Sequence, residues 1–149
     1  MTKEVHSDGS TTEYDYNSLG QLRMMKEVTA GNSTVREIVY RYDDGGNLNL
    51  ETRTGIDVTR QEDIVRYTYD KTNQLVGVEF VGYFKDTYTY DKAGNLLNDG
   101  EDSYTYDLEN RMLTRTSAAG TTVYDYDKAG SLIKETAPDG AAVIYTYNA

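Results

Sequence analysis

The side chains in this sequence that could carry out chemistry are acidic residues, tyrosines and a single histidine. His6 lies near the N-terminus and has no second histidine to share a metal ion or a proton with. The chain contains no cysteine, which excludes disulfides, thiolate metal sites and cysteine nucleophiles. The serines have no base to activate them as nucleophiles. We therefore expect a protein that is not an enzyme.

Pairs of acidic residues raise two further possibilities, a calcium site and a glycosidase-type carboxylate pair. The pairs Asp43/Asp44 and Asp125/Asp127 match neither the EF-hand loop nor the glycine-rich nonapeptide repeat. With 25 acidic residues, two carboxylates will lie close together by chance, and no pair stands out as catalytic. We predict no metal site, no cofactor and no catalytic residue, and we expect the aspartates to cap turns.

Charge and hydropathy restrict the partners. The 15 Lys and Arg against 25 Asp and Glu give a net charge of −10, so phosphates would be repelled. No apolar run is long enough to span a bilayer, and the N-terminus has no apolar signal-peptide region. We expect no nucleic-acid partner and no insertion into a membrane.

The tyrosines form a repeat. Tyr-x-Tyr followed by Asp or Asn begins at seven positions, with spacings of 26, 27, 21, 16, 20 and 21 residues, and only Tyr83 falls outside these pairs. The paired tyrosines are Tyr14, Tyr16, Tyr40, Tyr42, Tyr67, Tyr69, Tyr88, Tyr90, Tyr104, Tyr106, Tyr124, Tyr126, Tyr145 and Tyr147. Tyrosine favours strands, and each pair with its polar middle residue predicts a half-buried strand.

Each tyrosine pair begins a longer motif, Tyr-x-Tyr-Asp-x-x-Gly-x-Leu, whose cleanest copy runs from Tyr88 to Leu96. We number its residues as motif positions 1 to 9. Position 7 is always Gly or Asn, the residues that best tolerate positive φ, so a type I turn closed by a left-handed residue is predicted. The predicted turn residues are Asp43, Asp70, Asp91, Asp107 and Asp127 at position 4, and Gly20, Gly46, Asn73, Gly94, Asn110 and Gly130 at position 7.

A second set of turns is predicted between the motifs. These turns are Asp8-Gly9, Gly31-Asn32, Asp99-Gly100, Ala119-Gly120 and Pro138-Asp139-Gly140. Ile38, Val65 and Val143 each lie two residues before a tyrosine pair and should share its face, so we expect one aromatic and aliphatic face and one polar face. The predicted fold is all-β: antiparallel hairpin repeats in a curved, solenoid-like or partly wound sheet, with no helix and no domain boundary over residues 1–149.

The motif resembles the YD-repeat, or Rhs-repeat, family, with six complete copies and a truncated seventh ending at Tyr145-Thr-Tyr-Asn-Ala149. The resemblance implies a strand that spirals through hairpins into a hollow shell. Such shells enclose an effector in Rhs toxins and insecticidal toxin complexes, and similar shells act in adhesion by teneurins. Wall-associated proteins with these repeats have been linked to carbohydrate binding. The self-cleavage motif Asp-Pro-x-Gly of complete Rhs proteins is missing, because Pro138 precedes Asp139.

These observations predict a structural scaffold, one segment of a YD shell that encloses or presents a toxin or effector domain. The alternative is a carbohydrate or cell-surface binding module that uses the tyrosine-rich face to stack on sugars. The expected partners are neighbouring repeats or the enclosed domain, with a glycan as the alternative. The truncated last motif suggests a fragment of a longer protein, and its open strand edge predicts self-association. By resemblance, the protein is expected to be secreted or on the bacterial cell surface.

Overall fold

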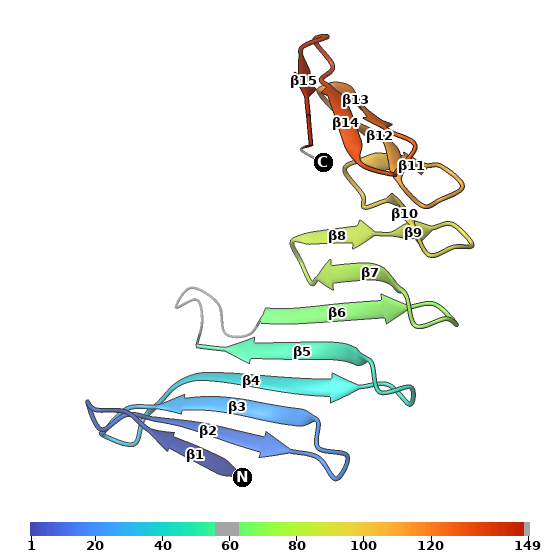
Figure 1. Ribbon diagram of the computed structural model, residues 1–149. Helices are drawn as coiled ribbons and strands as arrows, with labels where there is room; N and C mark the ends of the chain where they lie inside the picture. The colour runs from blue at the N-terminus through green and yellow to red at the C-terminus, as the bar shows by residue number, and fades with distance from the viewer. Residues whose placement is uncertain (56–62, 148–149) are drawn as a thin grey trace. The chain divides into compact units, whose positions relative to one another are not determined.

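A computed structural model describes residues 1–55 and 63–147, and these residues form only strands, turns and loops. The chain divides into two compact units, Met1–Lys85 and Asp86–Ala149, and each is considered by itself (Figure 1). The last two residues of the truncated seventh motif, Asn148 and Ala149, lie outside the described residues. That residues 1–149 form one array stays a prediction.

The first unit is built on an open antiparallel sheet in which each strand pairs with the next along the chain. Its strands are β1 (Thr2–Val5), β2 (Thr11–Tyr16), β3 (Leu22–Val28), β4 (Thr34–Tyr42), β5 (Leu48–Thr54), β6 (Asp63–Tyr69), β7 (Leu75–Phe80) and β8 (Phe84–Thr87), the last of which continues into the second unit. Because neighbouring strands of this sheet are consecutive in the chain and antiparallel, the motif turns, which follow β2, β4 and β6, all lie at one end of the strands (Figure 1).

The second unit repeats this meander with shorter strands. Its strands are β9 (Thr89–Tyr90), β10 (Leu96–Asn98), β11 (Ser103–Tyr106), β12 (Met112–Ser117), β13 (Gly120–Tyr126), β14 (Leu132–Thr136) and β15 (Ala142–Ile144). The sheet is again open, with β9 and β15 at its edges. The predicted all-β class of antiparallel hairpin repeats is confirmed.

Burial is concentrated at one place in the repeat, two residues before the first tyrosine. Thr12, Ile38, Val65 and Asp102 occupy this place in four different motifs, and each is at most 8% exposed. None of the described side chains is completely shielded from solvent. This is the burial expected of a single-layer sheet, which has no second layer to cover it.

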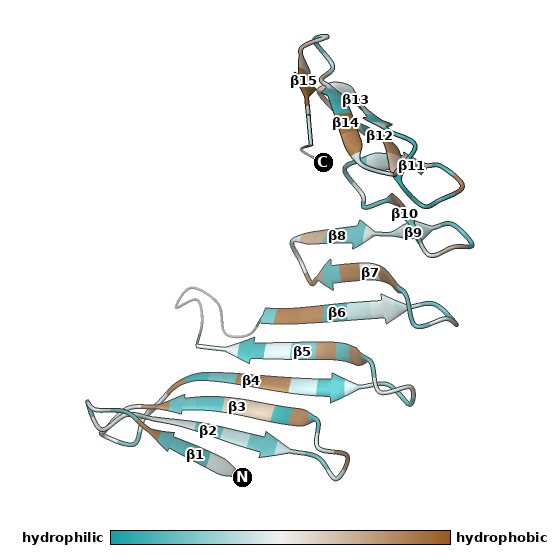
Figure 2. Ribbon diagram, in the orientation of Figure 1, coloured by the Kyte–Doolittle hydropathy of each residue, from teal (hydrophilic) through white to brown (hydrophobic). Residues whose placement is uncertain are grey.

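The two faces differ less than predicted. The tyrosine face also carries charged residues, among them the buried Glu51. The opposite face is not uniformly polar, because Met24 pairs with Val39 on it and Ile64 follows in the same row. Figure 2 shows hydrophobic and hydrophilic stretches alternating along β4 and β6, with a hydrophilic turn after each of these two strands. Among the described residues, no helix is long and apolar enough to cross a membrane.

Candidate functional site

The motif turns are built as predicted. In all six complete motifs the amide of position 4 donates to the carbonyl of position 8, and the amide of position 7 donates back to the carbonyl of position 4. The φ angles at position 7 are positive, from 62° at Asn110 to 92° at Gly94, so the predicted left-handed conformation is confirmed. The register shifts by one residue directly before the second tyrosine in the pairs of β2, β4, β6, β11 and β13, which is the predicted bulge.

The side chain at position 4, an aspartate in five of the six complete motifs, holds each turn closed. The Asp91 carboxylate accepts the amides of Ala93 (2.8 Å) and Asn95 (2.9 Å). Asp43, Asp70, Asp107 and Asp127 accept the position 8 amide of their own turns in the same way, as does the side-chain oxygen of Asn17 in the first motif. These hydrogen bonds hold the pKa of the Asp43 and Asp91 carboxyls below the ordinary value, so both are charged caps near neutral pH.

The first tyrosine of a pair donates its hydroxyl to a carboxylate. The bonds run from Tyr14 to Glu4 (3.3 Å), Tyr67 to Glu51 (3.0 Å), Tyr104 to Asp99 (2.6 Å) and Tyr145 to Glu135 (3.2 Å). Tyr40, Tyr88 and Tyr124 lie half-buried at the same motif position. The bond to Asp99, with some burial, raises the pKa of Tyr104 to about 12. This phenol therefore acts as a fixed hydrogen-bond donor, not as a base.

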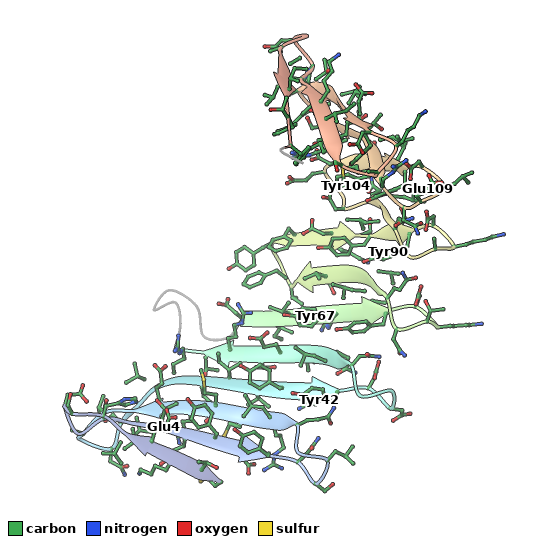
Figure 3. All side chains as sticks on the ribbon, viewed as in Figure 1. Glu4, Tyr42, Tyr67, Tyr90, Tyr104 and Glu109 are labelled. Atoms are coloured by element: carbon green, nitrogen blue, oxygen red, sulfur yellow. The ribbon has the colours of Figure 1, made fainter. Side chains whose placement is uncertain are left out.

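The second tyrosine of a pair reaches the preceding motif. Its hydroxyl donates to the main-chain carbonyl at position 9 of that motif: Tyr42 to Leu22 (2.8 Å), Tyr126 to Met112 (2.9 Å) and Tyr147 to Leu132 (2.8 Å). Tyr69, Tyr90 and Tyr106 are half-buried at the same motif position, whereas Tyr16 and Tyr147 are 47% and 61% exposed. Figure 3 labels one second tyrosine, Tyr42 on β4, and one first tyrosine, Tyr67 on β6. In these three motifs the second tyrosine bonds its hairpin to the hairpin before it.

A buried charged cluster on the tyrosine face was missed by the sequence analysis. Glu51, 7% exposed, accepts bonds from Arg53 Nε (2.6 Å) and the Tyr67 hydroxyl (3.0 Å), while Asp63 lies opposite Arg53 across the β5–β6 pair. The bulge that follows Leu48 explains the omission. It shifts the alternation of β5 by one residue, and this shift places Glu51 and Arg53 on the tyrosine face.

The second unit has a buried carboxylate of its own. Asp102, 7% exposed, accepts a bond from Arg115 Nε (2.6 Å), and it lies two residues before Tyr104. The apolar pattern in the sequence identified this motif place only where it is aliphatic, at Ile38, Val65 and Val143. Burial of the polar residues at the same place was therefore not predicted. Of these, Val143 is 54% exposed. The place in the repeat, more than residue type, was the signal that could have identified Asp102.

The residues considered for catalysis or metal binding lie apart. His6 Nε2 hydrogen-bonds the Thr12 hydroxyl (2.9 Å). Asp43 and Asp127 cap turns, while Asp44 is exposed and Asp125 pairs with Lys134 across β13 and β14. Within residues 1–55 and 63–147, no three His, Cys, Asp or Glu side chains are grouped so that they could hold a metal ion. The arrangement serves hydrogen bonding between hairpins.

Proteins of known sequence share this repeat. The family model described as teneurin YD-shell matches residues 1–149. The tRNA3(Ser)-specific nuclease WapA of Bacillus spizizenii is 32% identical over 172 residues, which include 100% of this chain and 7% of the relative. The tRNA nuclease WapA of Bacillus subtilis is 32% identical over 151 residues, 99% of this chain and 5% of the relative. The chain therefore spans only a small part of these relatives.

Solved structures share the fold. The crystal structure of TcdB2-TccC3 without its hypervariable C-terminal region matches 95% of this chain with a TM-score of 0.71 and 16% identity, over 9% of that chain. The crystal structure of TcdB2-TccC3-Cdc42 matches 89% of this chain with a TM-score of 0.67 and 19% identity, over 7% of that chain. With the repeat, the turn geometry and the family match over its whole length, the chain belongs to the teneurin YD-shell family.

Proposed function

We propose that this chain is a structural section of a YD shell that encloses or presents an effector domain of its parent protein. The observation that carries the proposal is the bond from the second tyrosine of one motif to the position 9 carbonyl of the motif before it, made by Tyr42, Tyr126 and Tyr147. Because these repeated side chains join a hairpin to the one before it, the motif suits a wall that is built from stacked hairpins. The fourteen paired tyrosines are then structural residues.

The relatives support a shell that serves another domain. The two Bacillus proteins are named as tRNA nucleases, and this chain matches 7% and 5% of their lengths. Their named activity belongs to the whole proteins. The described residues of this chain hold no grouping of nucleophile, base and orienting residue, so we assign the chemistry to a different part of the parent protein. For this segment we expect no intrinsic activity, and a purified chain that degrades tRNA would contradict that assignment.

Protease protection tests the enclosure. In the full-length parent protein, a domain inside an intact shell should be cleaved far more slowly than the same domain expressed alone. Val65→Asp, which places an unpaired charge at a position only 4% exposed, should open the wall and speed the cleavage. Val143→Asp, at the same motif place but 54% exposed, is the matched control and should leave protection unchanged. Equal cleavage rates with and without the shell would refute enclosure.

Carbohydrate binding is the less favoured alternative. Stacking on a sugar needs an accessible ring face, but twelve of the fourteen paired tyrosines are half-buried, and six of these twelve donate their hydroxyls to the chain's own acceptors. Tyr16 and Tyr147 are the most exposed members of the fourteen, at 47% and 61%. Glycan-array binding that is lost in the Tyr16→Ala and Tyr147→Ala variants would promote this alternative over the structural one.

Self-association and an extracellular location are two further proposals. The edge strands β1 and β15 each pair on one side only, and an open edge offers unpaired amides and carbonyls to another strand. Light scattering across a concentration series should detect dimers or larger species, and a strict monomer would contradict this.

For the parent protein we expect, by resemblance, secretion or surface exposure. Recovery of the parent protein only in the cytoplasmic fraction would contradict this expectation.

A further inference from the structure

Position 8 of the motif contacts two turns at once. Asn47 Nδ2 donates to Asp43 Oδ2 of its own turn (3.1 Å) and to Asn73 Oδ1 of the following turn (2.9 Å). In the second unit, Asn95 Nδ2 donates to Asp91 Oδ2 (2.9 Å) and to Asn110 Oδ1 (2.8 Å). The same three-residue link therefore runs from position 4 through position 8 to position 7 of the next motif, in both units.

The first motif makes the link with different residues. Here position 4 is Asn17, whose Nδ2 donates to Gln21 Oε1 (2.8 Å), and Gln21 Nε2 donates onward to the carbonyl oxygen of Gly46 (3.0 Å). An asparagine at position 4 thus donates to the side-chain oxygen of the position 8 amide. The NH₂ group of the position 8 amide is then available to bond the next turn. An aspartate at position 4 accepts one hydrogen of the position 8 NH₂, and the other hydrogen bonds the next turn.

Four pairs of consecutive complete motifs each lie inside one unit, and we call each pair a step. The fourth step has an arginine at position 8. Arg111, at position 8, donates to Asp107 Oδ2 of its own turn (2.6 Å), and its guanidinium carbon lies 5.1 Å from the ring centroid of Tyr126 in the following motif. The following position 7 is Gly130, which has no side chain to accept a bond. In all four such steps the position 8 side chain therefore contacts both its own turn and the next motif.

This pattern explains which motifs carry asparagine at position 7. Both Gly and Asn satisfy the left-handed conformation, so the turn alone does not choose between them. Asn73 and Asn110 each follow a motif with asparagine at position 8, Asn47 and Asn95. Gly46 and Gly130 follow a glutamine and an arginine, which bond to a main-chain carbonyl and an aromatic ring instead.

We propose that position 8 of each motif is a specificity-determining residue that selects, through position 7 of the next hairpin, which hairpin can stack after it. The selected partner is a YD turn with an asparagine at position 7 where position 8 is Asn, and with a glycine there where position 8 is Gln or Arg. The inference rests on contacts within each unit, so it holds whether or not the shell encloses an effector.

A double-mutant cycle on Asn47 and Asn73 tests the link. Asn73→Gly removes the acceptor and keeps the positive φ, Asn47→Ala removes the donor, and hydrogen exchange of the β5 and β6 amides reports the opening equilibrium. Each single variant should raise the opening constant about three- to tenfold, and the double variant should raise it by clearly less than the product of the two single effects. Any intrinsic effect of glycine in the turn cancels in the cycle.

Asn32→Gly provides the matched control. Asn32 has the same φ as Asn73, 63°, but lies at the opposite end of the hairpins, in the turn after β3. The effects of Asn47→Ala and Asn32→Gly should therefore multiply independently. A cycle with no coupling at Asn47/Asn73 and none at Asn95/Asn110, or equal coupling at the control pair, would overturn the proposal.

Exchanging the residue set gives a second test. Asn17→Asp removes the donor to Gln21 Oε1 and places a carboxylate beside that oxygen, so the bond from Gln21 to the Gly46 carbonyl should weaken and the opening constant should rise. Adding Gln21→Asn and Gly46→Asn installs the Asp-Asn-Asn set found in the next step, and it should return opening to within about threefold of the parent chain. A triple variant no more stable than Asn17→Asp alone would show that position 8 does not select its partner.

Discussion

The two units use the same turn but differ in the strands between turns. Motifs in the first unit begin 26 and 27 residues apart, and its strands reach nine residues in β4. In the second unit the spacings are 16, 20 and 21 residues, and β10 has only three. Among the described residues, the buried apolar side chains, Val28, Ile38 and Val65, all belong to the first unit. The motif therefore fixes the turn and the tyrosine rows, while the intervening residues determine how much apolar surface each hairpin buries.

The largest expected effect is a difference in stability loss between the two units when the same motif place is mutated. Val65 and Val143 both lie two residues before a tyrosine pair, but they are 4% and 54% exposed. Val65→Ala should lower the free energy of unfolding of the first unit by about 2 kcal/mol, because buried methyl groups are removed. Val143→Ala should cost less than about 0.5 kcal/mol in the second unit. Equal losses, measured by hydrogen exchange in each unit, would contradict the comparison.

The buried charged pair of the second unit should contribute more to stability than an exposed pair of the first unit. Arg115→Ala leaves the Asp102 carboxylate, 7% exposed, without its guanidinium partner, so we expect a loss of about 1.5 kcal/mol. The control is Arg23→Ala in the first unit, which breaks the more exposed pair with Asp15 and should cost less than about 0.5 kcal/mol. Urea unfolding of both variants gives the two values, and a smaller loss for Arg115→Ala would count against this difference.

The turns should respond alike in the two units. Gly46 and Gly94 have φ angles of 85° and 92°, which a β-branched residue adopts only with strain. Gly46→Val and Gly94→Val should each destabilise their unit by at least about 1 kcal/mol. Gly46→Asn and Gly94→Asn should change the free energy of unfolding by less than about 0.5 kcal/mol through backbone strain, because Asn73 and Asn110 adopt the same conformation at equivalent places. A valine variant as stable as the asparagine variant would refute the turn assignment.

Acid should weaken both units through their turn aspartates. The pKa of Asp91 is lowered by the Asn95 side-chain amide and by backbone amides, and that of Asp43 by the Asn47 backbone amide and side chain. Because each folded pKa lies below the unfolded one, the stabilisation is present above about pH 4 and is lost as pH falls through the folded pKa. Asp43→Asn and Asp91→Asn should flatten this acid loss, since Asn17 caps its turn without a charge. Unchanged pH profiles from pH 5 to pH 2 would contradict the assignment.

The sequence predicted the parts of the fold that depend on local backbone geometry. The turns, the bulges and the shared face of each tyrosine pair all follow from glycine, asparagine and aspartate at fixed spacing. The buried Glu51 was not predicted because a bulge reverses the alternation that follows it. The links between turns depend on which hairpins lie side by side, and spacing within one motif does not contain that information.

The central claim is that the paired tyrosines join consecutive hairpins, and Tyr→Phe variants test it most directly. Tyr42→Phe and Tyr126→Phe remove only the hydroxyls that donate to the carbonyls of Leu22 and Met112. Tyr16→Phe is the matched control, because Tyr16 occupies the same motif position but is 47% exposed.

The measurement is the free energy of unfolding of each unit, followed by hydrogen exchange of its strand amides. Tyr42→Phe in the first unit and Tyr126→Phe in the second should each lose about 1 kcal/mol, because a half-buried carbonyl loses its donor. Tyr16→Phe should stay within about 0.3 kcal/mol of the parent chain. Losses at Tyr42 and Tyr126 no larger than that at Tyr16 would contradict the claim that these hydroxyls hold the repeats together.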